Sequence, residues 1–399
     1  MSTPLIRLQE PHRQPAQPAG WALWQLGFRP FYLLAAGFAA LSVPLWALQF
    51  SGWLGAGLWR GPVWHAHEML FGYTLAVVVG FLFTAGRNWS GQPTPNGRSL
   101  QALALLWVAG RVAVLTPWPL AAMLVNVAFP LLAALGLGRA LVAGGNRRNY
   151  FFIGALAMMG LAQALVHAAL AGWVQLPSSM GLQLALDLVL FIMAVMGGRV
   201  IPMFTNNGVP GAGAQRHALV ERAALGSVLL IMAADALQVR GLPLAALLAA
   251  AAIAQATRLA LWRPWAVRSN PLVWVLHVAW CWLVLHLLLR AAAEAGWIAS
   301  SPAIHALTAG AIGTLTLGMM TRTARGHTAR PLRADAADVW AYGLVIAGAA
   351  VRVFLPLVWP AAQSGAVLVS GLLWSSGFAV YAWHYGPWLC RTRLDGQAG

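Results

Sequence analysis

Histidines are the residues of this sequence most suited to chemistry. His65 and His67 stand in one short run with Glu68, and His305 opens another apolar stretch. Neutral imidazole is the common protein ligand of copper, zinc and haem iron, and a carboxylate beside it is able to transfer protons. We therefore expect His65, His67 and His305 to bind metal and Glu68 to act as the catalytic proton donor.

The spacing of the first two histidines limits how they can bind. On a regular α-helix, His65 and His67 point in directions about 200° apart. They therefore cannot both hold one ion unless the first helical turn is unwound. The alternatives are that one of them binds metal while the other hydrogen-bonds to a ligand or serves a second centre, or that both lie at the water interface.

His277 is a third type of candidate, because it stands in an apolar stretch among tryptophans. A planar macrocycle needs such a slot, so we expect His277 to be an axial ligand of haem, or else to bond a neighbouring carbonyl. The chain has only two cysteines and no Cys-x-x-Cys-His run. Any haem is therefore non-covalently bound haem b, and cysteine-ligated zinc or iron–sulfur sites are excluded.

Basic residues close several of the apolar stretches, namely Arg87, Arg199, Arg322 and His327. Arginine pairs readily with carboxylates at two points, so these four residues are expected to bind a cofactor, for example through haem propionates. The alternative is that they only anchor helix ends at the membrane surface.

The elements that must position these residues are membrane helices. Hydrophobic residues make up 60% of the 399 residues and charged residues only 9%, which is far from the average of a water-soluble domain. A helix needs about 20 apolar residues to cross the hydrocarbon layer of a bilayer. Twelve runs are long enough, so we expect an all-α polytopic bundle surrounded by lipid. The runs are 31–50, 64–85, 100–116, 119–142, 150–173, 180–204, 218–239, 241–262, 271–292, 303–324, 339–355 and 359–384.

The charge pattern predicts the orientation of these helices. With a cytoplasmic N-terminus, only five of the 25 basic residues, all arginines, fall outside: Arg60, Arg111, Arg240, Arg290 and Arg352. This asymmetry predicts that both termini are cytoplasmic. The 25 basic residues are scattered singly, which excludes a nucleic-acid-binding face. Residues 1–28 are expected to form a polar cytoplasmic tail, and residues 29–399 a single transmembrane domain.

This topology places five imidazoles at the outer leaflet, and we expect them to converge on one buried coordination pocket. They are His65, His67, His167, His286 and His305. Asp187 and Asp235 are the other acids at membrane depth, where they should pair with arginine or transfer protons. Gly310, Gly313 and Gly318 should allow close helix packing or leave room for a flat cofactor.

Five short motifs, in this order along nearly the whole chain, resemble the NnrS family. They are Gly27-Phe28-Arg29-Pro30-Phe31-Tyr32, His65-Ala66-His67-Glu68-Met69, Gly86-Arg87-Asn88-Trp89, Gly198-Arg199-Val200-Ile201-Pro202-Met203-Phe204-Thr205, and Met320-Thr321-Arg322 with Gly326-His327-Thr328.

The resemblance implies a twelve-helix protein of the bacterial inner membrane that carries haem and copper and is associated with denitrification and defence against nitric oxide. The positions that match the family are His65, His67, Glu68, His277, His305, Arg322 and His327. The expected function is to bind nitric oxide and to reduce it to nitrous oxide, with electrons from an external donor.

Two other functions remain open from the sequence. Twelve helices are also typical of secondary transporters, although the loop after the second run, residues 86–99, lacks the Gly-x-x-x-Asp-Arg pattern of the major facilitator group. A sensor that binds metal or nitrosyl species without turnover is the third possibility.

Overall fold

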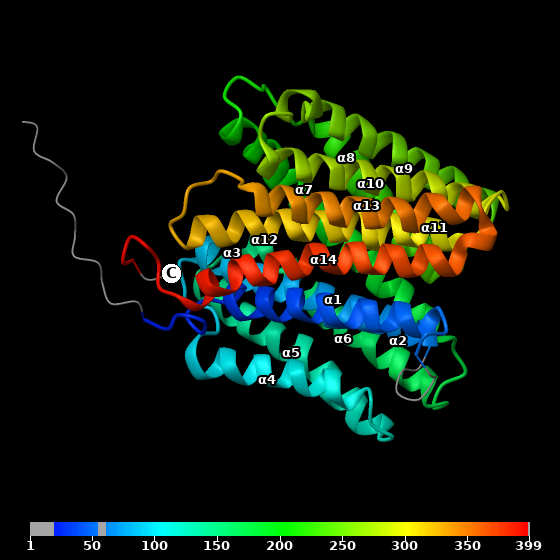
Figure 1. Ribbon diagram of the computed structural model, residues 1–399, viewed down its shortest axis with the longest axis horizontal. Helices are drawn as coiled ribbons and strands as arrows, with labels where there is room; N and C mark the ends of the chain where they lie inside the picture. Colours follow the sequence, from blue (N-terminus) through cyan, green and yellow to red (C-terminus); the bar gives the residue numbers. More distant parts are fainter. Residues whose placement is uncertain (1–19, 55–60, 398–399) are drawn as a thin grey trace, which may run out of the picture.

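The computed structural model describes residues 20–54 and 61–397, and these residues form a bundle of twelve helical rods. The rods run roughly parallel to the long axis of the molecule (Figure 1). The expected all-α bundle is therefore confirmed. Residues 1–19 of the predicted tail lie outside the part of the chain that the structure describes.

Ten of the twelve rods are continuous α-helices. Their bounds are α1 (Phe28–Phe50), α4 (Gly97–Ala113), α5 (Pro119–Ala143), α6 (Phe151–Leu170), α7 (Ser178–Gly208), α8 (Ala218–Ala236), α9 (Leu242–Leu261), α10 (Pro271–Glu294), α13 (Ala336–Val358) and α14 (Gln363–Cys390). Short 3₁₀ turns occupy Arg147–Asn149, Pro264–Val267 and Pro360–Ala362.

The other two rods each contain a π-helical segment between two α-helices. The first consists of α2 (Gly61–His67), the π-segment Glu68–Thr74 and α3 (Leu75–Ser90). The second consists of α11 (Ser300–His305), the π-segment Ala306–Ile312 and α12 (Gly313–His327). Such wider turns are rare in helices and are frequent at functional sites.

Ten rods are long and apolar enough to cross a membrane. The remaining two are α4, which has only 17 residues, and α8, which carries Glu221, Arg222 and Asp235. The chain is thus a multi-pass membrane protein, and all twelve predicted runs correspond to rods.

The described chain starts and finishes at the same end of the bundle. Trp21 pairs with Arg391 in an isolated bridge, and the Ala22 N–H donates to the Cys390 carbonyl at 2.8 Å. We call this the terminal end and the opposite one the distal end, which carries α2 and α11 (Figure 1). An even number of crossings follows. Which side of the membrane each end faces stays a prediction.

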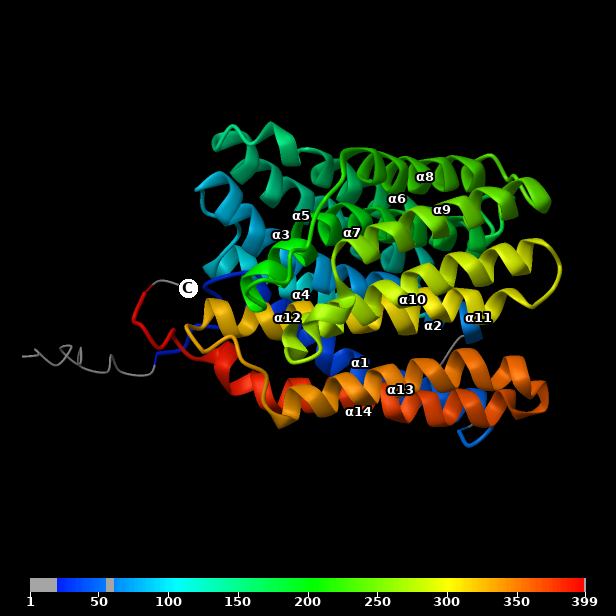
Figure 2. The same cartoon turned by 90° about the horizontal axis from the view of Figure 1, so that it is seen from above.

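Contacts between the helices build two flanks around a central layer. α14 packs against both α1 and α13, and these three helices lie along one edge of the molecule (Figure 2). α5, α6 and α8 lie along the opposite edge, while α10 packs between α9 and the rod that contains α12. The rods that carry the candidate histidines are therefore surrounded by other helices.

Most predicted boundaries differ from the observed ones by a few residues. The last run was expected from residue 359, but Pro360 opens a 3₁₀ turn and α14 begins at Gln363. The same helix continues beyond residue 384, because Tyr385 and Leu389 pack into the core. Hydropathy alone does not indicate these packing contacts.

Candidate metal and cofactor site

A cavity of about 480 Å³ lies in the distal half of the bundle, within the size range of sites for organic ligands. His65 from α2 and His305 from α11 both line it. Most of its wall is apolar and includes Trp46 of α1, Tyr73 of the first π-segment and Trp374 of α14. The cavity thus brings together two of the predicted metal ligands in an apolar, aromatic environment.

The two imidazoles in this cavity are held differently. The His65 ring stacks on the Trp46 ring, with centroids 5.3 Å apart and an angle of 13° between the planes. Its Nδ1 atom is buried without a hydrogen-bond partner. His305 Nδ1 lies 2.8 Å from the Ser301 carbonyl, so Nδ1 carries the hydrogen and Nε2 keeps its lone pair. Each ring therefore has a nitrogen available to a ligand.

Arg352 of α13 brings a positive charge to the same cavity. Its Nη2 donates to the Ser301 hydroxyl at 3.1 Å, whereas its Nη1 is buried without a hydrogen-bond partner. An unsatisfied guanidinium nitrogen in an apolar cavity is costly unless an anionic or polar group of a ligand meets it.

Both π-segments line this cavity, and the first also contacts α12 of the second rod. Tyr73 Oη and Thr316 Oγ1 are 2.5 Å apart, which joins the two rods. A tryptophan satisfies a carbonyl in each segment: Trp107 Nε1 donates to Gly72 O at 3.0 Å, and Trp374 Nε1 donates to Ala309 O at 3.1 Å. The irregular backbone beside the histidines is thus fixed by neighbouring helices.

His67 faces a different environment from His65. Its Nδ1 donates to Glu68 Oε1 at 2.8 Å, and Arg111 Nη1 donates to the same oxygen at 2.7 Å. The His67 ring also meets the ring of His167 on α6 nearly at a right angle, with centroids 4.9 Å apart. His65 and His67 thus face different surroundings, which is one of the arrangements considered for them, and their roles as metal ligands stay predictions.

The expectation of a single pocket for all five distal imidazoles was wrong. His65 and His305 share the cavity, whereas His67 and His167 contact each other outside its lining. His286 belongs to neither group, and its Nδ1 lies 2.8 Å from the Ala303 carbonyl. The reason is the helical geometry of α2, which points residues 65 and 67 to opposite sides.

The residues predicted to bind a cofactor lie at the terminal end, away from the cavity lining. His277 Nδ1 lies 3.1 Å from the Val273 carbonyl, and its Nε2 lies 3.3 Å from both Thr205 Oγ1 and Trp262 O. Both imidazole nitrogens thus have oxygen neighbours. This is the competing arrangement considered for that residue, and its role as an axial ligand stays a prediction.

The other predicted cofactor residues also make protein contacts at the terminal end. Arg199 Nη1 donates to Asn149 Oδ1 at 2.7 Å, and the Arg322 guanidinium lies 3.9 Å from the centre of the Phe204 ring. The His327 ring lies against Phe28, with centroids 5.5 Å apart. These contacts join α7, α12 and α1 to their neighbours.

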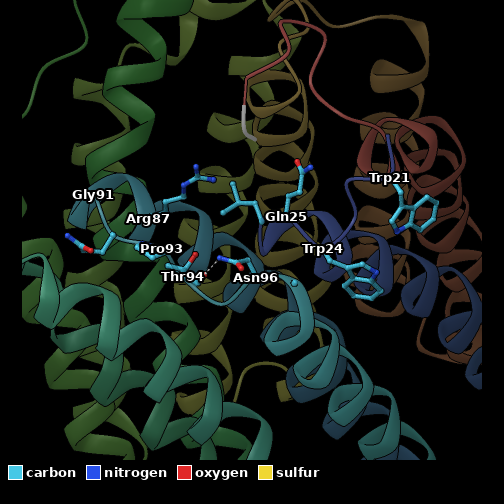
Figure 3. Close-up of a pocket in the computed structure, with 11 residues that line it drawn as sticks. Trp21, Trp24, Gln25, Arg87, Gly91, Pro93, Thr94 and Asn96 are labelled. Carbon is cyan, nitrogen blue, oxygen red and sulfur yellow. Dashed lines mark hydrogen bonds between the residues drawn. The ribbon is translucent and has the colours of Figure 1, made fainter. Parts of the chain in front are cut away.

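Arg87 lines an open hollow of about 610 Å³ on the terminal end. Figure 3 shows its guanidinium above the turn that follows α3, with Gln25, Thr94 and Asn96 around the same hollow. Polar side chains and an open mouth distinguish this hollow from the apolar distal cavity.

Asp187 and Asp235 pair with arginine, which is one of the two expected outcomes. Arg290 Nη2 lies 2.5 Å from Asp235 Oδ1, and Gln183 Nε2 donates to Asp187 Oδ1 at 2.9 Å. Gln183 also lines the cavity. These acids therefore balance charge beside the site.

Comparison with known families decides the assignment. Residues 22–393 match the family described as NnrS protein, which is almost the whole chain. The chain belongs to the NnrS family. A search of curated proteins finds no match. The family is linked to the response to nitric oxide, and its members are described as containing haem and copper.

In this NnrS chain the structure adds residues that the sequence did not single out as parts of a site. They are Arg352 and Tyr73 at the cavity, and Arg111 and Asn126 beside Glu68. A signal was present for two of them. Arg111 and Arg352 are among the five arginines on the side that the positive-inside rule leaves poor in charge.

Among residues 20–54 and 61–397, no group of three or more His, Cys, Asp or Glu side chains has the geometry of a metal site.

Proposed function

We propose that this protein is a haem- and copper-carrying protein of the bacterial inner membrane that binds nitric oxide and reduces it to nitrous oxide. Membership of the NnrS family supports the link to nitric oxide. The single structural observation that carries the proposal is the apolar distal cavity, in which two imidazoles and one arginine have atoms free for a ligand.

The distal cavity suits a haem in three respects. Its wall is mostly apolar and aromatic, His65 and His305 offer imidazole nitrogens, and the free Nη1 of Arg352 is matched to a propionate. We therefore assign His65 and His305 to haem and Arg352 to its carboxylate. This assignment is an alternative to the predicted role of His277 as an axial ligand of haem, and substitution of these histidines distinguishes the two. The predicted cofactor roles of Arg87, Arg199, Arg322 and His327 stay predictions.

The reaction needs two molecules of nitric oxide, two electrons and two protons, and it gives one nitrous oxide and one water. One N–N bond forms, one N–O bond breaks, and the oxygen atom that is released leaves as water. Haem and copper would supply redox-active, electrophilic centres close to the substrate. The electrons come from an external one-electron donor.

The residues of the chain would provide binding, exclusion of water and protons. An apolar cavity favours the uncharged, weakly polar substrate over water. Glu68 Oε2 is buried without a hydrogen-bond partner, so it is the atom of that carboxyl group that is free to exchange a proton. Its other oxygen is held by His67 and Arg111.

The test is an absorption spectrum and a metal analysis of the purified protein, followed by nitric oxide consumption with reductant. The proposal predicts bound haem, bound copper and formation of nitrous oxide at half the rate of nitric oxide loss. Protein without haem that consumes no nitric oxide would refute it. Binding of nitric oxide without turnover would instead favour a sensor, and substrate uptake into liposomes by haem-free protein would favour a transporter.

A further inference from the structure

A chain of polar contacts fixes the orientation of the His67 ring. Asn126 Nδ2 donates to Ala122 O at 2.8 Å, and Asn126 Oδ1 accepts from Arg111 Nη2. Arg111 Nη1 in turn holds Glu68 Oε1 at 2.7 Å, and this oxygen accepts from His67 Nδ1 at 2.8 Å. Because an ionised carboxylate is only an acceptor, His67 Nδ1 carries the hydrogen and Nε2 keeps its lone pair.

Each of the two adjacent rings, His67 and His167, has one buried nitrogen without a partner. His67 Nε2 and His167 Nε2 both lack hydrogen-bond partners in the described chain, and the two residues are only 3% and 8% exposed. Leaving such atoms unsatisfied in an apolar interior destabilises the fold. Buried polar groups without partners call for a specific explanation, and a bound ion is one that satisfies both nitrogens at once.

The distance between the rings fits a shared ion. A metal–nitrogen bond is about 2.0 Å long and the ring centre lies about 1.1 Å further on, so two imidazoles at a tetrahedral angle have centres about 5 Å apart. The observed separation of the His67 and His167 ring centres is 4.9 Å. The separation of the ring centres thus equals that expected for two ligands of one ion.

We propose that His67 and His167 bind one copper ion through their Nε2 atoms and that Glu68 is the positioning residue for His67. A carboxylate that accepts from the distal nitrogen of a metal-binding histidine fixes its tautomer and raises its basicity. The identity of the metal rests on the proposed function, whereas the ligand pair rests on the geometry alone.

Imidazole nitrogen is a good ligand of copper as well as of zinc. The choice of copper over zinc therefore rests on the proposed function. Two protein ligands leave a coordination position open to nitric oxide.

This copper site and the distal cavity lie on opposite sides of the same helical turn. The cavity is lined by Ala66, Met69 and Leu70. The two residues that stand between Ala66 and Met69 in the sequence point the other way: Glu68 contacts α4, and His67 contacts α6. Substitution of His65 therefore tests the haem assignment, and substitution of His67 tests the copper assignment.

The experiment measures copper bound per chain and the electron paramagnetic resonance spectrum of the purified full-length protein after loading with copper(II). His167→Ala and His67→Ala should each lower copper binding by more than tenfold, while the haem absorption spectrum, which also reports folding, is retained. His286→Ala is the matched control, since it removes another buried distal imidazole and should retain the copper.

Glu68 is tested by copper affinity. Glu68→Ala should weaken copper binding by about 10–100-fold, and Glu68→Gln, which keeps an acceptor oxygen for His67 Nδ1, should restore part of it. A purely structural role for Glu68 would change stability without this order of affinities.

Several results would overturn the copper site. One is full copper binding with an unchanged spectrum in His167→Ala. Another is loss of copper in His65→Ala or His305→Ala but not in His167→Ala. If neither His67 nor His167 variant folds, nitrogen hyperfine splitting from fewer than two imidazoles in the unsubstituted protein would also overturn it. Copper held by two imidazoles without nitric oxide turnover would support the site and contradict only the proposed function.

Discussion

Buried imidazoles at the two ends of the bundle differ in whether their hydrogen bonds are satisfied. At the terminal end, both nitrogens of His277 lie against protein oxygens. At the distal end, His65, His67 and His167 each keep one buried nitrogen without a partner. A satisfied ring contributes to packing, whereas an unsatisfied ring needs a ligand. The distal end is therefore the end at which we expect chemistry.

Two arginines, Arg258 and Arg352, show a similar contrast. At the terminal end, Arg258 is 1% exposed, and it binds both oxygens of Glu221 at 2.9 and 2.6 Å as well as the Ala194 carbonyl. At the distal end, Arg352 has only the Ser301 hydroxyl as a hydrogen-bond partner within the described chain, and its Nη1 is free. The first arginine completes a structural network, and the second is available to a ligand.

Breaking the ion pair between Arg258 and Glu221 at the terminal end should produce the largest loss of stability. Glu221→Ala leaves the buried Arg258 charge without its partner, and the loss of one member of a buried pair costs about 3–5 kcal/mol. Thermal unfolding in detergent measures this effect. The fraction of the Glu221→Ala variant that folds should keep the haem spectrum. Loss of haem from this folded fraction would contradict the view that the ion pair at the terminal end is purely structural.

Narrowing the distal cavity should have a smaller effect on stability but a clear effect on haem. A Cβ atom at Gly313 would lie 2.6 Å from Trp374 Nε1, so Gly313→Ala should push that ring into the cavity. Overpacking of this kind costs about 1–3 kcal/mol. Haem content and melting temperature are the measurements.

Gly343→Ala on α13 is the control for this substitution. Nothing lies within 4 Å of a Cβ atom at Gly343, so alanine there should leave haem content unchanged and keep or raise stability. Equal haem content in the Gly313→Ala and Gly343→Ala variants would show that the position of Trp374 does not limit the space available to haem in the cavity.

The N-terminal cap of α13, at the terminal end, should give a pH-dependent contribution to the free energy of unfolding. Asp335 accepts the Asp338 N–H at 3.1 Å and begins α13, so Asp335→Ala should cost about 1 kcal/mol. Partial burial opposes ionisation of Asp335, but the Asp338 N–H and Arg325 outweigh it and lower the pKa of this carboxyl group.

The sign of the pH effect follows from this lowered pKa. The stabilisation is fully present above the ordinary pKa of about 3.9. It is lost as the pH falls through the lower pKa of the folded state. Unfolding measured between neutral and acidic pH should show a smaller acid-dependent loss in Asp335→Ala than in the unsubstituted protein. Parallel curves for the two proteins would contradict this assignment.

Breaking the hydrogen bond between the first π-segment and α12 should have the smallest effect on stability. Tyr73→Phe removes the 2.5 Å contact with Thr316, whose hydroxyl keeps its bond to the Ile312 carbonyl. One hydrogen bond contributes about 0.5–1.5 kcal/mol. If the hydrogen bond between Tyr73 and Thr316 fixes the position of the cavity wall, the haem spectrum of Tyr73→Phe should shift while its haem content stays constant. An unchanged spectrum would limit Tyr73 to packing.

Much of the fold could be predicted from the sequence, because membrane helices are specified by local hydropathy. All twelve runs became rods, and the glycines of the tenth rod allow close packing, as at Gly310 against Trp282. The sites were harder to predict, since they depend on which helices become neighbours. His67 and His167 are 100 residues apart in the chain, and only packing of the first broken rod beside α6 brings them together.

One sequence signal for the site lay in the exceptions to the charge rule. Four of the five arginines that the topology assigns to the outside have buried partners or line the cavity in the structure. They are Arg111, Arg240, Arg290 and Arg352, and the fifth, Arg60, lies outside the described residues. An arginine that departs from the positive-inside rule thus indicates a buried partner or a ligand. By contrast, the buried nitrogens of His65, His67 and His167 that lack hydrogen-bond partners could be recognised only from the side-chain geometry of the structure.

The most direct test of the account compares the haem absorption spectra of three purified variants, His65→Ala, His305→Ala and His277→Ala. The account predicts that haem is lost or its spectrum is strongly altered in the two distal variants. It predicts that His277→Ala keeps the spectrum of the unsubstituted protein and loses only stability. Loss of haem in His277→Ala, with unchanged spectra in both distal variants, would contradict it.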